Sequence, residues 1–205
     1  AAYGKGEEII GEYLRSRPHL LGKAFISTKW GEYFDAATGI SAHDYTKGSL
    51  ISSVSDSLKK LGKIDLLYIH GTGPKDKVLE CLRDQEVIDE MNRMKEEGKI
   101  RYTGVSISKG DILEQAVNED LLERFDAVQI PIDLYKSRQD LVNFIYNKGI
   151  AIVINSPVRK GGSSADIRKN YAELLSDNRV AVVLTGTRNN LGDTIGNVKD
   201  IGRNL

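Results

Sequence analysis

The stretch Leu66-Leu67-Tyr68-Ile69-His70-Gly71 is a short apolar run that ends in one histidine and one glycine. An apolar run without polar alternation is typical of a parallel strand that is buried on both faces. Folds built from such strands place their chemistry at the carboxyl ends of the strands. His70 would stand at that end, and the sequence on either side fits the same kind of fold.

Short β-prone runs alternate with amphipathic helical patterns along the whole chain, which predicts parallel βαβ units. The expected strands are 24–29, 65–70, 102–106, 127–132, 150–154 and 180–185. The expected helices are 5–16, 50–61, 87–97, 112–124, 141–147, 167–175 and 194–201. The polar segment 31–48 is expected to be a loop. Six such strands could form an open doubly wound sheet or most of an eight-stranded barrel.

Glycine-rich phosphate-binding motifs are missing from the sequence. Neither G-x-G-x-x-G nor G-x-x-x-x-G-K-[ST] occurs, and Gly71-Thr72-Gly73 lacks the third glycine of the first motif. A doubly wound nucleotide-binding fold would usually carry such a turn after its first strand. The pattern of elements alone still leaves both architectures open.

The composition is that of an ordinary globular chain, with 40% hydrophobic and 28% charged residues among 205. This length favours a single domain over residues 1–205. Lys plus Arg and Asp plus Glu both number 29, so no basic excess favours a nucleic acid or an anionic membrane. Cys81, the one cysteine, suits a reducing cytoplasm. We assign no metal ligands, and the oligomeric state stays open.

Polar residues follow most of the expected strands and would meet at one mouth in a barrel. They are Lys29, Trp30, His70, Gly71, Ser106, Ser108, Gln129, Asp133, Asn155, Ser156 and the segment 185–188. Alone, a strand-end lysine is more often a solvated charge, and a lone histidine is as often structural. Together on successive strands, the two favour a functional pair. A nearby ammonium would make a tyrosine a usable acid, and Tyr3 could be that tyrosine, or an aromatic packed on the barrel.

These residues lie within motifs that resemble those of the aldo-keto reductases, a family of (β/α)8 barrels that use NAD(P)H. The opening segment 1–11 (AAYGKGEEIIG) is similar to the end of the family's D-T-A-x-x-Y-G-x-x-E motif. The segment 57–71 (SLKKLGKIDLLYIHG) resembles its second signature. Further matching pieces are STKWG (27–31), EEGKIRYTGVS (96–106), DAVQIPID (126–133), SPV (156–158) and LTGTRNN (184–190).

The resemblance implies a role for each matching residue. Tyr3 would be the general acid, Lys29 would lower the pKa of the tyrosine, and His70 would orient the substrate carbonyl. Trp30 would line the substrate pocket or belong to the core. The residues implied in cofactor binding are Ser106, Gln129, Ser156, Gly161, Gly186, Thr187, Arg188 and Asn197. An arginine at 188 suits NADPH, because a guanidinium pairs bidentately with a phosphate, although NADH is possible.

The resemblance also implies that the first two barrel strands and the family's aspartate lie before Ala1, so that six of eight strands are present. Asn155 stands where the family usually has an aromatic residue against the nicotinamide. The expected function is therefore cytoplasmic reduction of an aldehyde or ketone by a hydride from NAD(P)H. One alternative is a weakly active or inactive cofactor-binding barrel of this family. Another is an unrelated (β/α)8 lyase or isomerase that uses Lys29 as base or Schiff-base amine.

Overall fold

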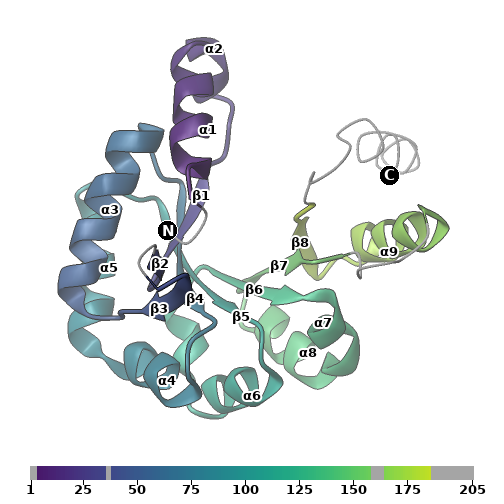
Figure 1. Cartoon of the computed structure of the whole chain (residues 1–205). Helices are drawn as coiled ribbons and strands as arrows, with labels where there is room; N and C mark the ends of the chain where they lie inside the picture. Colours follow the sequence, from purple (N-terminus) through teal and green to yellow (C-terminus); the bar gives the residue numbers. More distant parts are fainter. Residues whose placement is uncertain (1–3, 36–37, 158–163, 186–205) are drawn as a thin grey trace.

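Six parallel strands form one curved sheet in the computed structural model of the chain, which describes residues 4–35, 38–157 and 164–185. The sheet order is β1-β4-β5-β6-β7-β8, so strands that follow one another through a helical crossover lie side by side (Figure 1). The strands are β1 (Ser27–Trp30), β4 (Leu66–Gly71), β5 (Tyr102–Ile107), β6 (Ala127–Pro131), β7 (Ala151–Asn155) and β8 (Val180–Val183). The architecture is an α/β fold that corresponds to a partial (β/α)8 barrel, as the resemblance predicts.

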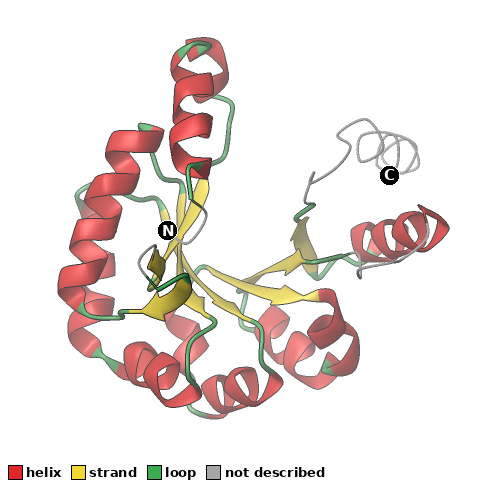
Figure 2. Ribbon diagram, in the orientation of Figure 1, coloured by secondary structure: helices red, strands yellow, loops and turns green. Residues whose placement is uncertain are grey.

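Helices follow the convex side of this sheet, as Figure 2 shows by the ring of red ribbons outside the yellow strands. They are α1 (Gly6–Arg15), α2 (Pro18–Leu21), α3 (Lys47–Leu61), α4 (Lys75–Arg83), α5 (Gln85–Glu96), α6 (Gly110–Asn118), α7 (Ile132–Ser137), α8 (Gln139–Asn147) and α9 (Ser164–Ser176), with a 3-10 turn η1 (Leu121–Arg124). The helix expected over 194–201 lies outside the described residues. None of the described helices is long and apolar enough to cross a membrane.

Each strand divides its side chains between two faces, because successive residues of a strand point to opposite sides. On β4, Leu67 and Ile69 belong to the large core shared with the helices. Leu66 and Tyr68 form a separate small cluster with Ala127 of β6 on the concave side. The helix-facing core therefore supplies most of the burial, and the concave side is left for the mouth residues.

The segment 31–48 is not a loop, and that prediction is wrong. It contains an antiparallel hairpin of β2 (Glu32–Asp35) and β3 (Ile40–His43), followed by the start of α3. Gly39 supplies a positive φ of 70° in the turn between the two strands, a conformation that is cheap only for glycine. Short polar strands resemble loop sequence because neither face is fully buried.

Helix α3 (Lys47–Leu61) ends at the predicted residue but begins three residues before the predicted helix 50–61. Gly62 adopts φ +83° at the end of α3 and its N–H bonds to the Leu58 carbonyl, as is typical of a glycine C-cap. Thr46 caps the other end by accepting a hydrogen bond from the Ser49 N–H. The expected helix 112–124 is instead divided into α6 and η1 at Asp120, which has φ +54°. Helices α4 and α7 are short additions that the sequence pattern did not predict.

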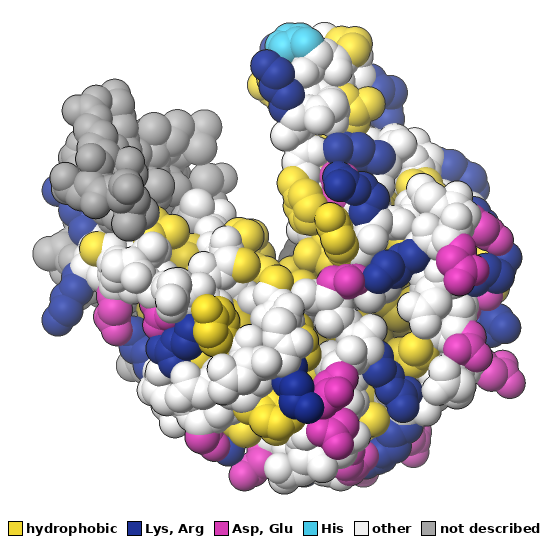
Figure 3. Space-filling view, turned by 180° about the vertical axis from the view of Figure 1, so that it is seen from behind, with side chains coloured by type: hydrophobic (Ala, Val, Ile, Leu, Met, Phe, Trp, Pro, Cys, Tyr) yellow, Lys and Arg dark blue, Asp and Glu magenta, His cyan; other side chains and the backbone are white. Residues whose placement is uncertain are grey.

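An apolar groove of about 390 Å³ lies on the concave side near the amino ends of the strands. Its lining includes Phe25, Leu66, Tyr102 and Val182 from β1, β4, β5 and β8 or from the segments next to them. Seen from behind, hydrophobic side chains gather in the notch of the molecule's outline (Figure 3). Because the polar mouth residues follow the opposite ends of the strands, this groove is separate from the candidate site.

Asp65 joins the amino ends of β1, β4 and β5. Its carboxylate is 2% exposed and accepts the Ile26 backbone N–H at 2.8 Å, the Lys63 ammonium at 3.0 Å and the Arg101 guanidinium at 3.0 Å. Burial alone would raise the pKa of Asp65, but these three donors hold it below its ordinary value. The carboxylate therefore stabilises the fold above its unfolded pKa of about 4, and this contribution is lost as the pH falls through the folded pKa.

Replacing Asp65 by Ala is expected to lower the free energy of unfolding by about 1–3 kcal/mol, since it leaves the buried Ile26 N–H without its acceptor, while the Lys63 and Arg101 side chains are 30% and 62% exposed to water. Urea unfolding at pH 7 measures the change. D56A is the matched control, because Asp56 is 60% exposed in its pair with Lys59 and should cost at most about 1 kcal/mol. A D65A variant as stable as D56A would contradict this role for Asp65.

Candidate active site

The mouth residues predicted from the sequence lie on neighbouring strands at the carboxyl edge of the sheet. His70 of β4 pairs in register with Ser106 of β5, which pairs with Gln129 of β6. Lys29 of β1 pairs with Tyr68, two residues before His70 on the same face of β4. Four of the predicted positions are therefore brought together. Of the residues given a catalytic, substrate or cofactor role, the structure also describes Trp30 and Ser156, whereas Tyr3, Gly161, Gly186, Thr187, Arg188 and Asn197 lie outside the described residues.

Lys29 is a partly buried cation on the concave face. Its Nζ donates a hydrogen bond to Ser106 Oγ at 3.2 Å across β4 and lies 6.0 Å from the ring centroid of Tyr68. Burial lowers the pKa of Lys29 to about 8, with the negative charge of Glu32 opposing the shift. The ammonium is therefore charged at neutral pH but poorly solvated, which makes it a strong stabiliser of any anion that forms beside it.

Glu32 is a site residue that sequence reasoning missed. It begins β2, immediately after Gly31, and its Oε2 lies 2.8 Å from His70 Nδ1. Both side chains are largely buried, with 14% and 11% of their surface exposed. The available sequence signal was the pair of short runs EYFD and ISAH around a glycine-containing turn, which predicts a hairpin. Recognising it would have placed Glu32 directly beside the end of β1.

The charges of this pair are set by their surroundings. Burial lowers the pKa of His70 to about 4, the positive charge of Lys29 adds to the shift, and Glu32 opposes it. Burial would raise the pKa of Glu32, but hydrogen bonds from Thr72 and Ser41 and the charge of His70 lower it below its ordinary value. At neutral pH the site therefore holds a neutral imidazole beside an ionised carboxylate.

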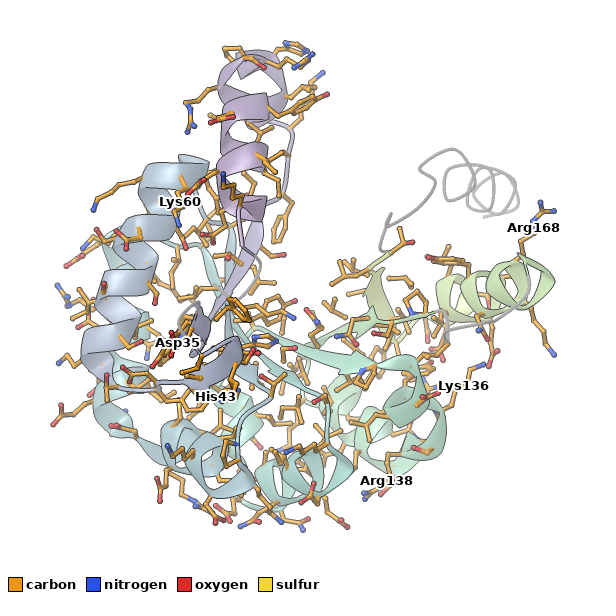
Figure 4. All side chains as sticks on the ribbon, in the orientation of Figure 1. Asp35, His43, Lys60, Lys136, Arg138 and Arg168 are labelled. Carbon is orange, nitrogen blue, oxygen red and sulfur yellow. The ribbon has the colours of Figure 1, made fainter. Side chains whose placement is uncertain are left out.

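The hairpin is held over the strand ends by further polar contacts. Thr72 Oγ1 donates to Glu32 Oε2 at 2.7 Å and lies 3.4 Å from His43 Nε2. The Tyr45 hydroxyl donates to the His70 carbonyl at 2.6 Å and accepts the Gly73 N–H at 3.3 Å. Figure 4 shows Asp35 and His43 on this hairpin, next to the ends of β1 and β4. The two bonds of the Tyr45 hydroxyl hold the backbone at the end of β4, next to the His70 side chain.

Trp30 follows Lys29 on β1 and therefore points to the opposite face of the sheet. Its side chain is 1% exposed, belongs to the helix-facing core and makes an edge contact with Tyr45 at 6.1 Å between ring centroids. Of the two roles that the sequence left open, the geometry favours the core over the substrate pocket.

Gly104 lets the Tyr68 ring lie flat on the concave face below the mouth. A Cβ at position 104 would come within 2.7 Å of that ring and 2.8 Å of the Ala127 carbonyl oxygen. A side chain at this position would therefore force the ring toward Lys29. The glycine of the IRYTGVS segment is explained by this close approach.

Two buried side-chain acceptors at the mouth suit a ligand that carries an amide. Gln129 Oε1 and Asn155 Oδ1 are buried and have no hydrogen-bond partner among the described residues. Buried polar atoms are normally paired, so such atoms mark a place for a donor. The carboxamide NH₂ of a nicotinamide is a donor of the right kind. Ser156, which follows Asn155, has an uncommon φ of +50°, as is frequent for residues at ligand sites.

The fold and the site together define a partial (β/α)8 barrel with a lysine and a histidine at the carboxyl ends of adjacent parallel strands. The family model described as "Aldo/keto reductase family" matches residues 1–198. The chain belongs to the aldo-keto reductase family, and the alternative of an unrelated lyase or isomerase is thereby removed.

Curated relatives and solved structures agree with this assignment. The chain is 26% identical over 161 residues to "Uncharacterized oxidoreductase YqkF" of Bacillus subtilis, covering 77% of this chain and 49% of that protein. It is 27% identical over 143 residues to the methylglyoxal reductase DkgB of Yersinia pestis, covering 68% and 52%. The holo form of an aldo-keto reductase from Bacillus halodurans has the same fold, with TM-score 0.74 at 20% identity over 95% of this chain and 72% of that one. The chain spans about half the length of these curated relatives.

Proposed function

We propose that this chain reduces an aldehyde or ketone to the alcohol with NAD(P)H, with Tyr3 as general acid, Lys29 as its activating cation and His70 beside the carbonyl. The observation that carries the proposal is the Lys29 ammonium. Its pKa is lowered by burial, and it donates a hydrogen bond to Ser106, which pairs in register with His70 at the mouth. Such a cation stabilises a phenolate and so turns a tyrosine into an acid near neutral pH.

The cofactor, when bound, supplies the hydride that is added to the carbonyl carbon. As that bond forms, the carbonyl π electrons move to the oxygen, which takes the proton of the Tyr3 hydroxyl. Lys29 stabilises the phenolate that remains until a proton from solvent restores the phenol. Ser106 and Gln129 would hold the carboxamide, and Ser156 and Gly161 would lie near the pyrophosphate. Gly186, Thr187, Arg188 and Asn197 would bind the adenosine phosphate.

Titration with NADPH, followed by Trp30 fluorescence, and assay of an aldehyde panel test this proposal together. The expected result is saturable quenching and oxidation of NADPH that depends on the aldehyde. Quenching without reduction of any aldehyde would overturn the catalytic proposal and favour a cofactor-binding barrel. Trapping of a lysine adduct by borohydride would contradict the role of Lys29 as a cation that acts without forming a covalent bond.

The preference for NADPH over NADH is proposed to depend on Arg188. R188A removes a charge-assisted bidentate contact with the 2′-phosphate, an interaction worth about 1.5–3 kcal/mol. The Kd of NADPH is therefore expected to rise by about 10- to 100-fold, while that of NADH changes by less than about twofold. Equal weakening of both cofactors, measured by the same fluorescence titration, would show that Arg188 does not contact the phosphate.

A further inference from the structure

Glu32 is the charged neighbour of His70 that the proposed reaction does not yet use. Its Oε2 is 2.8 Å from Nδ1 of the ring, and the hydrogen bonds from Thr72 and Ser41 favour its ionised form. An ionised carboxylate can only accept hydrogen bonds. The Nδ1 atom must therefore carry the proton that is shared with Glu32.

A neutral imidazole has one protonated nitrogen, so a proton on Nδ1 leaves Nε2 as an acceptor. The charged or titratable groups that act on this ring include Lys29 from β1, Glu32 from β2 and His43 from β3. Lys29 disfavours a second positive charge next to it, which keeps the ring neutral. A ring in this state takes a hydrogen bond from a hydroxyl and does not give one to a carbonyl oxygen.

We propose that Glu32 is a positioning residue that fixes His70 in the Nδ1–H tautomer, with Nε2 directed at the mouth as a hydrogen-bond acceptor. The kinetic consequence of this inference rests on the proposed function, whereas the tautomer follows from the Glu32–His70 contact alone. His70 then accepts from the hydroxyl of the alcohol, and so serves proton relay and alcohol binding. Orientation of the carbonyl by donation from His70 would require the other tautomer or an imidazolium.

Hydrogen bonds from outside the hairpin hold both members of the Glu32–His70 pair. Thr72 holds Glu32 from the end of β4, and the Tyr45 hydroxyl holds the His70 carbonyl, so acid and ring are fixed by separate contacts. At metal sites, removal of the residue that orients a histidine in this way typically lowers activity by about 10- to 100-fold. We expect a similar loss when the Glu32 carboxylate is removed. The side chain of Glu32 acts through His70 and does not itself touch the substrate.

The direct test is ¹⁵N NMR of the histidine rings in the 205-residue chain, which has three histidines, with His70 assigned by an H70Q variant. The wild type is expected to show His70 as the neutral Nδ1–H tautomer at pH 7. E32L, of similar size but without an acceptor, is expected to move the ring to the Nε2–H tautomer. E32Q, whose amide oxygen can still accept, is expected to keep Nδ1–H. An Nε2–H tautomer or an imidazolium in the wild type, or no change in E32L, overturns the proposal.

Kinetic measurements on the same variants test the positioning role of Glu32 separately from the proposed function. E32L is expected to lower kcat by about 10- to 100-fold with the Kd of NADPH unchanged, and E32Q is expected to recover kcat to within about threefold of the wild type. E96A, a change of an exposed glutamate on α5, is the matched control and should match the wild type. Loss of kcat in E32Q equal to that in E32L contradicts the acceptor role. If the wild-type chain shows no reductase activity, the proposed function is contradicted, but the NMR result still decides which tautomer His70 adopts.

Discussion

Replacing Tyr3 by Phe is expected to lower the turnover of carbonyl reduction by about 10²–10⁴-fold, the usual contribution of a general acid. The phenyl ring keeps the volume of the side chain and loses only the proton donor. The negative charge that develops on the carbonyl oxygen then has no acid to neutralise it. The Kd of NADPH is expected to stay within about twofold, since the hydroxyl acts on the substrate oxygen. Steady-state kinetics and cofactor titration measure the two effects.

The matched control is Y13F, because Tyr13 lies on α1 and is 51% exposed. That variant should be indistinguishable from the wild type in turnover and in cofactor binding. Unchanged turnover in Y3F would remove Tyr3 from the mechanism. Parallel loss of turnover and cofactor affinity would instead point to a structural role at the start of the chain.

Replacing Lys29 by Met is expected to lower turnover by about 10- to 1000-fold, which corresponds to the 1–3 pKa units by which a near cation lowers the pKa of an acid. The same variant is expected to be more stable than the wild type by about 0.5–2 kcal/mol. The reason is that burial lowers the pKa of Lys29 to about 8, so the folded chain holds a charge that water would solvate better. Activity and stability therefore change in opposite directions.

The stability gained by K29M is expected to depend on pH. Below pH 8 both folded and unfolded chains hold the Lys29 proton, and the folded state bears the whole desolvation cost. Between pH 8 and the ordinary value of 10.5, the folded chain loses the proton first and the cost declines. The stability gain of K29M in urea unfolding should thus be largest below pH 8. K23M, at an exposed lysine, is the control; an equal gain there, or a loss of stability in K29M, would contradict the account.

The alignment of the mouth residues could be predicted from the sequence because parallel strands place their carboxyl ends along one edge. His70, Ser106 and Gln129 lie in register on β4, β5 and β6. His70 and Ser106 end their predicted strands, and Gln129 is the polar residue within the apolar run of the third. The distinction between Lys29 and Trp30 was also available from the alternation of a strand, which sends neighbours to opposite faces. The family resemblance alone does not make that distinction.

The sequence carried a signal for the hairpin of Glu32, but it carried none for the contact of Glu32 with His70, because that contact is long-range. The residues of β2 and β3 are mostly exposed or half-buried, so no apolar pattern marks them. The contact of Glu32 with His70 crosses from β2 to β4, and only the fold brings the two residues within 2.8 Å. The depressed pKa of Lys29 likewise arises from burial on the concave face. Neither effect is encoded in local sequence.

The central claim is that this chain transfers hydride from NAD(P)H to a carbonyl carbon at the mouth defined by Lys29 and His70. Single-turnover reduction of an aldehyde, with NADPH deuterated at one or the other C4 position, tests it most directly. The account predicts that deuterium reaches the carbonyl carbon from one of the two labelled cofactors only, because the cofactor is fixed against one wall of the mouth. Bound cofactor that is never oxidised, or deuterium delivered equally from both positions, would contradict it.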